Sequence, residues 1–230
     1  MLVLEITILV LLGLLFFYFM TKEIQEVISL KKTLKQIIGR AHISSKEDLI
    51  KIKDHLNSTI SHDQKFKEKK RPLLRHTASQ ILKSNYGFCG ENARVAIKLF
   101  LLGGMKANRI YLFRKEWEHV LVEHQMNDLW YMFDGHYDEN TLLEDEKVAS
   151  IFSENINEYP DDYPNNPYLD YCRIKLLHNI PILTFFSKVR LPSLMTYVVE
   201  SPYLIKAIGC FVVVVFSYLL VGDWFCHGLR

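Results

Sequence analysis

The sequence predicts an α+β domain carried between two membrane-spanning helices. Long apolar stretches lie near both ends of the 230-residue chain, at residues 2–20 and 203–221. Between them, apolar residues with helical spacing begin at residue 89, and strand-like segments follow at residues 119–124 and 129–133. Because a helix and neighbouring strands can bury their apolar faces against each other, a helix packed on an antiparallel sheet is expected.

The first apolar stretch, residues 2–20, is interrupted only by Glu5 and Thr7. Its length suits a bilayer, which a helix crosses with about 20 residues. No basic segment precedes the stretch and no small-residue cleavage site follows it, which favours a membrane span over a cleaved signal peptide. A buried core helix is the alternative.

A helical linker region is predicted at residues 22–72, with a helix that begins at Ser44 and Ser45. Its last part, residues 65–72, is basic and is either a solvated linker, which we favour, or a contact with anionic lipid headgroups. Further along the chain, residues 77–83 and 144–152 are predicted helices. Residues 159–168, rich in Pro, Asn and Asp, are a predicted loop, either a lid or a plain surface loop.

Cys89 is the first candidate for a catalytic residue. It begins the apolar helical run that ends at Gly103 and Gly104, so it lies at or beside a helix N-terminus. The unpaired amides there favour an anionic sulfur and can also receive an oxyanion on a substrate carbonyl. The alternative is a buried cysteine that acts as a small apolar residue.

His119 and Asp134 lie on the two strand-like segments. A hairpin centred between Met126 and Asn127 would place them directly opposite each other, with Cβ atoms roughly 4.5–5.5 Å apart. The alternative is a surface histidine and an aspartate at the hairpin end. His124 and His136 have no comparable partner in this register.

Residues 176–202 form a predicted membrane-proximal segment, because Lys188 and Arg190 interrupt its apolar character and exclude a further span. The second span, residues 203–221, contains four consecutive valines, and Lys206 near its start can extend to the interface. A buried core helix is again the alternative.

Basic residues flank the inner ends of both spans, which predicts a cytoplasmic middle segment; an extracytoplasmic one is the alternative. They are Lys22, Lys31, Lys32, Lys35, Lys188 and Arg190.

Four short motifs together resemble the transglutaminase-like superfamily, which is related to the papain-like cysteine proteases. They read GFCGE at residues 87–91, GMKANRI at 104–110, HVLVE at 119–123 and LWYMFD at 129–134. The resemblance implies a transglutaminase-like domain over residues 73–175, with a nucleophile helix packed on an antiparallel sheet. It also implies that Cys89 is the nucleophile, His119 the general base and acid, and Asp134 the carboxylate that orients the imidazole.

The chain departs from the related families at two positions. Lys83 stands where papain-like enzymes often place an oxyanion-binding glutamine, and Gly135 stands where a proline often follows the aspartate. The candidates for the missing oxyanion residue are Gln80, Asn85 and Asn92.

Composition limits the classes of function. The net charge of +2 and the lack of a basic patch interleaved with aromatic residues argue against nucleic-acid binding. The four cysteines are too widely spaced for a zinc site or a compact disulfide framework, so no metal or cofactor is expected.

The predicted function is that of a membrane-anchored thiol enzyme that acts on a peptide or protein amide through an acyl-enzyme at Cys89. Hydrolysis by a cysteine peptidase or amidase is favoured, and a transamidating acyl transferase would use the same three residues. The other alternative is an inactive binding or scaffold module at the membrane. The expected partners are the amide substrate and the lipid bilayer, with a membrane protein as a further candidate.

Overall fold

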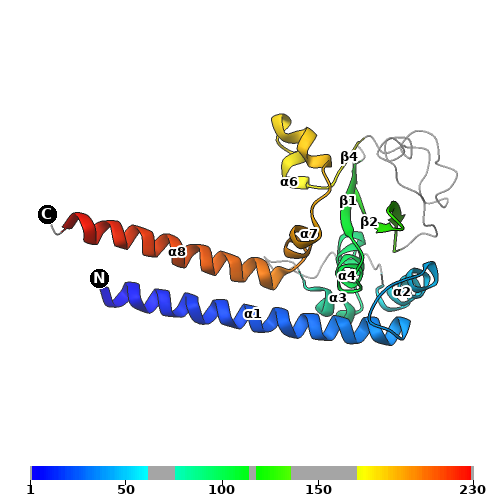
Figure 1. The fold of residues 1–230 in the computed structure, drawn as a ribbon, viewed down its shortest axis with the longest axis horizontal. Coiled ribbons are helices and arrows are strands. Elements are labelled where there is room, and N and C mark those ends of the chain that lie inside the picture. Colours follow the sequence, from blue (N-terminus) through cyan, green and yellow to red (C-terminus); the bar gives the residue numbers. More distant parts are fainter. Residues whose placement is uncertain (1, 62–75, 114–117, 136–169, 229–230) are drawn as a thin grey trace.

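A helix lying on a four-stranded antiparallel sheet forms the centre of the domain in this computed structural model, which describes residues 2–61, 76–113, 118–135 and 170–228 (Figure 1). The helices are α1 (Leu2–Ile38), α2 (Lys46–Thr59), α3 (Ala78–Ser84), α4 (Cys89–Leu102), α6 (Lys175–His178), the 3₁₀ helix η3 (Pro181–Lys188), α7 (Ser193–Val199) and α8 (Pro202–Gly228). The strands are β1 (Ala107–Phe113), β2 (Glu118–Met126), β3 (Leu129–Phe133) and β4 (Asp170–Cys172). The predicted mixture of helix and sheet is therefore confirmed.

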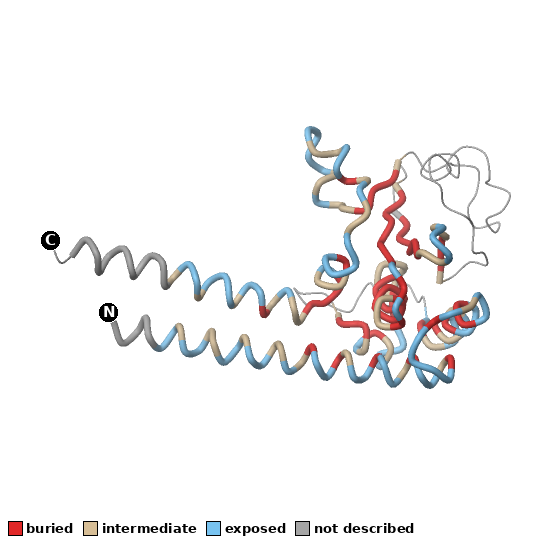
Figure 2. The backbone as a smooth tube through the Cα atoms, in the orientation of Figure 1, coloured by how far each residue is buried: buried red, intermediate tan, exposed pale blue. Residues whose placement is uncertain are grey.

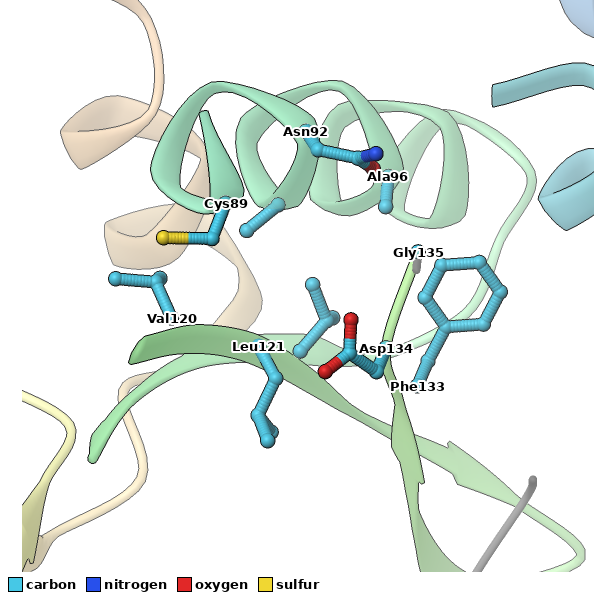
Figure 3. Close-up of a pocket in the computed structure, with 10 residues that line it drawn as sticks. Cys89, Asn92, Ala96, Val120, Leu121, Phe133, Asp134 and Gly135 are labelled. Atoms are coloured by element: carbon cyan, nitrogen blue, oxygen red, sulfur yellow. The ribbon is translucent and has the colours of Figure 1, made fainter. Parts of the chain in front are cut away.

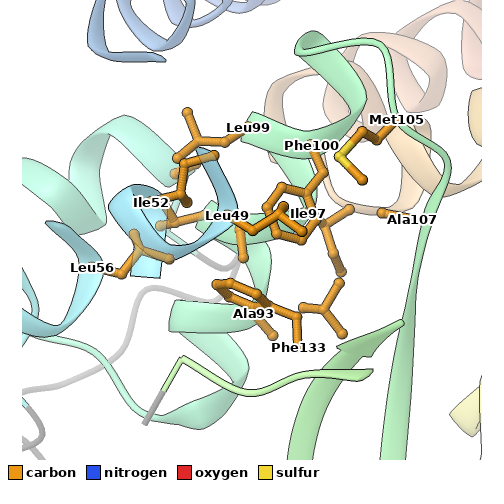
Figure 4. Packing of buried hydrophobic residues seen from close by; sticks show 14 of the residues in the cluster. Leu49, Ile52, Leu56, Ala93, Ile97, Leu99, Phe100, Met105, Ala107 and Phe133 are labelled. Atoms are coloured by element: carbon orange, nitrogen blue, oxygen red, sulfur yellow. The ribbon is translucent and has the colours of Figure 1, made fainter. Parts of the chain in front are cut away.

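The sheet has the strand order β3-β2-β1-β4, and α4 packs on it. Phe100 of α4 meets Phe133 of β3 edge to face, with ring centroids 4.9 Å apart. Leu49 and Ile52 of α2 cover α4 from the other side, so a single apolar core joins α2, α4 and the sheet (Figure 4). This core fixes the direction of α4, and with it the position of the cysteine at the beginning of α4.

The β2–β3 hairpin has a different register from the predicted one. Val122 pairs with Phe133 and Met126 with Leu129, so the turn is centred between Asn127 and Asp128. Both turn residues have positive φ angles, 51° and 61°, as in the two-residue turns whose twist matches that of antiparallel strands. Continuing the ladder puts position 121 opposite Asp134, and the prediction that His119 lies there is wrong.

The shift keeps His119 and Asp134 on the same face of the sheet. Moving the centre of the turn by one residue moves each pairing partner by two, and side chains two residues apart along a strand share a face. His119 is therefore a diagonal neighbour of Asp134 and not a direct one. Diagonal neighbours remain within reach of long or aromatic side chains.

Two long helices, α1 and α8, run side by side away from the sheet and bring both chain ends to the same end of the molecule (Figure 1). The α1 helix continues without a break through the start of the predicted linker region, because Leu30 and Leu34 are buried against the domain. Within the described residues, Thr7–Ile38 is the one single helix long and apolar enough to cross a membrane, a property that signal sequences share. Only 6% of the most apolar 18-residue window of this helix is buried, whereas the core helix of a soluble protein is mostly buried. The helices Pro181–Lys188 and Ser193–Val199, bent by 118° relative to each other, pass the same test only if the two are counted as one span.

The second predicted span corresponds to α8. Its apolar part with described side chains, Pro202–Ser217, is shorter than a membrane-crossing window. The basic stretch at residues 65–72, the helix predicted at 144–152 and the loop predicted at 159–168 lie outside the described residues.

The predicted helix starts are found. Ser45 caps α2: the Asp48 amide donates to the Ser45 hydroxyl, and the Ser45 amide donates to the Asp48 carboxylate. Thr77 caps α3 in the same way with Gln80. These reciprocal caps satisfy amides that would otherwise have no partner at a helix N-terminus.

Candidate active site

Cys89 is the first residue of α4, as predicted, and its side chain is half-buried. The chain enters the helix from an extended residue, Phe88, whose amide donates to the Glu91 carboxylate at 3.1 Å. A Cβ atom at Gly87 would lie 2.9 Å from the Glu91 Cβ and 3.1 Å from the Ile60 side chain. Glycine is therefore required for this close approach, which sets the cysteine at the beginning of the helix.

His119 and Asp134 form a buried pair. The His119 Nε2 and the Asp134 Oδ2 are 2.6 Å apart, and both residues are 5% exposed. Burial by itself lowers the pKa of His119, but the Asp134 carboxylate, with a further contribution from Cys89, raises it to about 9. The imidazole is therefore protonated at neutral pH.

The Cys89 side chain lies close enough to the same imidazole to contribute to its raised pKa. Because Nε2 faces Asp134, Nδ1 is the ring nitrogen left for the sulfur. A protonated imidazole beside a cysteine stabilises the thiolate, which is the nucleophilic form of the side chain. The structure thus brings the three predicted catalytic residues together in the order Cys89, His119, Asp134.

A pocket between α4 and the sheet runs past Cys89 and Asp134 (Figure 3). About 190 Å³ of empty space, part of it open to solvent, lies between these side chains, and none of it is wide enough for a water molecule. Its lining consists of Cys89, Asn92, Ala93, Ala96, Val120, Leu121, Val122, Phe133, Asp134 and Gly135. The pocket is therefore too narrow in this conformation to hold a side chain of a substrate.

Two of the three oxyanion candidates have other roles. Gln80 accepts a hydrogen bond from the Thr77 amide at 3.0 Å and donates to the Tyr203 hydroxyl at 3.4 Å. Asn85 ends α3 in a left-handed conformation, with φ at 59°. Neither residue lines the pocket.

The third candidate, Asn92, lines the pocket and is 2% exposed. Its amide points towards Gly135, whereas the Cys89 sulfur points the opposite way (Figure 3). A Cβ atom at Gly135 would overlap the Asn92 side chain, which explains why no larger residue follows Asp134. Asn92 therefore packs beneath the aspartate and is not directed at the thiol.

Arg109 is a residue of the site that the sequence reasoning noted only as part of a motif. Its Nη1 donates to the carbonyl of Gly90, the residue directly after Cys89, at 2.9 Å. Its Nε and Nη2 bind the two oxygens of Glu200 at 2.6 and 2.8 Å. Burial opposes the charge, but Glu200 keeps the pKa of Arg109 above its usual value. An arginine inside an apolar strand, as in the sequence ANRIYLF, is the signal that could have drawn attention to it.

Among the described residues, no group of three His, Cys, Asp or Glu side chains is arranged to hold a metal ion. No protein-family model matches this chain, and no curated protein matches it. The transglutaminase-like resemblance therefore stays a prediction that depends on the motifs and on the geometry of the three residues.

Proposed function

We propose that this protein is a thiol enzyme that cleaves a peptide or protein amide, with Cys89 as the nucleophile. The observation that supports this most directly is the position of His119, which contacts the Cys89 side chain and lies 2.6 Å from Asp134. Nucleophilic catalysis by cysteine needs this set of a thiol, a base and a group that orients the base. The transglutaminase-like core is part of the same proposal.

In the proposed reaction, the Cys89 thiolate attacks the carbonyl carbon of the amide and forms a tetrahedral oxyanion. Backbone amides in the first turn of α4 stabilise this charge. His119 then donates its proton to the nitrogen of the departing amine, and the carbon–nitrogen bond breaks to leave a thioester on Cys89. Water attacks the thioester, His119 takes the proton from the water, and the carboxylic acid leaves. An amine in place of water would make the enzyme an acyl transferase.

We further propose that α1 anchors the protein in a membrane, that α8 crosses beside it, and that the domain is cytoplasmic. Glu200 lies two residues before the beginning of α8 and binds Arg109, which in turn binds the Gly90 carbonyl beside Cys89. Arg109 therefore connects Gly90, the residue after Cys89, to Glu200, two residues before α8. A substrate amide close to the membrane surface is the one this arrangement would reach.

The test uses the full chain in lipid nanodiscs and an electrophilic acyloxymethyl ketone probe, with the labelled cysteine identified by mass spectrometry. We expect the probe to label Cys89 and not the buried Cys172. His119→Ala should reduce the labelling rate at pH 7 by at least tenfold, because the imidazolium that stabilises the thiolate is lost.

His178→Ala is the matched control, since this histidine lies on α6 and stacks on Phe113. It should keep the wild-type labelling rate. A folded His119→Ala protein that is labelled as fast as wild type would contradict the enzyme proposal. That result would favour the inactive scaffold.

A further inference from the structure

The segment formed by α6, η3 and α7, called here the 175–199 segment, carries large apolar side chains that are exposed. Figure 2 shows most of this segment as exposed or intermediate. Four of them are at least three-quarters exposed: Leu176 at 75%, Ile182 at 89%, Phe185 at 80% and Leu194 at 75%. Soluble surfaces rarely gather this many large apolar side chains on one short segment. These exposed side chains therefore favour an apolar environment over water.

Two hydroxyl-bearing residues of the same segment, Ser187 and Thr196, face the protein, whereas Asn179 and Ser193 are exposed. Ser187 is fully buried, and its backbone carbonyl accepts hydrogen bonds from the amides of Arg173 and Ile174 at 2.8 and 2.9 Å. Thr196 is 3% exposed and donates to the Asn108 Oδ1 at 3.0 Å. Water on the outside would favour the opposite distribution, with apolar residues buried and hydroxyls exposed.

Buried ion pairs hold the segment in this orientation. Glu123 of β2 is fully buried and binds Arg173 through both oxygens, at 2.7 and 2.9 Å. It also binds the Nε of Arg190 at 3.1 Å. Turning the apolar side chains inward would break these contacts and leave a buried carboxylate without its partners, which is costly.

The segment lies where the long helices leave the domain. Along the long axis of the molecule, α6 and η3 are level with the beginning of α8 (Figure 1). The α2 helix lies beside the C-terminal end of α1, far from the two chain ends. The chain passes from α7 into α8 through Glu200 and Ser201, and α8 then exposes Ile205 and Phe211 at 44% and 56%. The apolar surface of the segment is thus level with the beginning of the apolar surface of α8 along this axis.

We propose that the outward face of the 175–199 segment is inserted into the interfacial layer of the bilayer that α1 and α8 enter. The occupant of this face is lipid, namely headgroups and the upper part of the acyl chains. Interfacial helices bury their apolar faces about 5–10 Å deep in this layer. The proposal depends on the membrane anchoring proposed above, and it adds a third point of contact that fixes the domain against the membrane surface.

The test places a photoreactive benzoylphenylalanine at Ile182 or Phe185 of the full chain in phosphatidylcholine–phosphatidylglycerol nanodiscs. Ile50 of α2 is the matched control, because it is an apolar residue with 47% exposure at the far end of the molecule. Phe17 of α1, 68% exposed, is the positive control for anchoring. Thermal melting of each variant confirms that the protein is folded.

We expect lipid adducts by mass spectrometry at positions 17, 182 and 185, with at least tenfold less at position 50. Adducts at position 17 without any at positions 182 and 185 would overturn this proposal and leave the anchoring intact. Cross-linked dimers at positions 182 and 185 would overturn it in favour of a second copy of the chain. Loss of lipid adducts at position 17 as well would refute the anchoring itself.

Discussion

Replacing Asp134 with asparagine should remove most of the pH-dependent stability that His119 gives the folded protein. Burial lowers the pKa of His119, but Asp134, followed by Cys89, raises it from 6.5 to about 9. A pKa that is higher in the folded state than in the unfolded state means that the protonated form stabilises the fold. This stabilisation is complete below pH 6.5 and is lost as the pH rises through about 9.

The size of the effect follows from the change in pKa. A rise from 6.5 to about 9 corresponds to about 3 kcal/mol in the free energy of unfolding, at about 1.4 kcal/mol per pKa unit. For a chain of this length, each kcal/mol shifts the melting temperature by roughly 2–4 °C. The wild-type melting temperature should therefore fall by about 6–12 °C more than that of Asp134→Asn between pH 6 and pH 9.5.

Tryptophan fluorescence during heating of the full chain in nanodiscs measures this difference, since the sequence has three tryptophans. Asp128→Asn is the matched control, because it removes the same charge from the turn of the same hairpin and asparagine tolerates the left-handed backbone there. It should keep the wild-type dependence on pH. If Asp134→Asn also kept it, the reasoning about the His119–Asp134 pair would be wrong.

Three further predictions concern the surroundings of the site. Arg109→Met should lower the free energy of unfolding by about 3–5 kcal/mol in denaturant melts, because it leaves Glu200 buried with fewer partners. Arg40→Ala removes a half-exposed arginine from Asp48, whose buried carboxylate keeps its bonds from the Ser44 and Ser45 amides; it should cost less than about 1 kcal/mol and serves as the control. Gly135→Ala should slow labelling of Cys89 and lower the melting temperature through overlap with Asn92, whereas Gly13→Ala, with no atom within 4 Å, should change neither. A reporter fused at position 65 should show a cytoplasmic location, and an extracytoplasmic signal would refute the charge argument for orientation.

Local sequence was enough to predict where the helices around the site begin. Ser45 and Thr77 cap their helices through hydrogen bonds to residues three positions further on. The beginning of α4 at Cys89 could be predicted for the same reason, since a glycine-containing turn and an apolar period of helical spacing both lie within a few residues of it. Interactions between residues this close in the chain can be predicted from the amino-acid sequence.

The register of the hairpin shows the limit of such reasoning. The sequence QMND contains the turn residues, but it does not show which two of them take left-handed backbone angles. Asn127 and Asp128 do so, and the partner of every residue in β2 moves by two positions. The contact between His119 and Asp134 could still be predicted because this shift keeps both side chains on one face.

The sequence by itself therefore determined the α+β class, the helix that begins at Cys89 and the three residues that meet there. Only the tertiary structure decided that Arg109 links Glu200 to the turn beside Cys89, because Arg109 and Glu200 are 91 residues apart in the chain. It also decided that the 175–199 segment turns its apolar side outward, since buried ion pairs to Glu123 set that orientation. Contacts between distant residues depend on how the elements pack, and packing is a property of the whole fold.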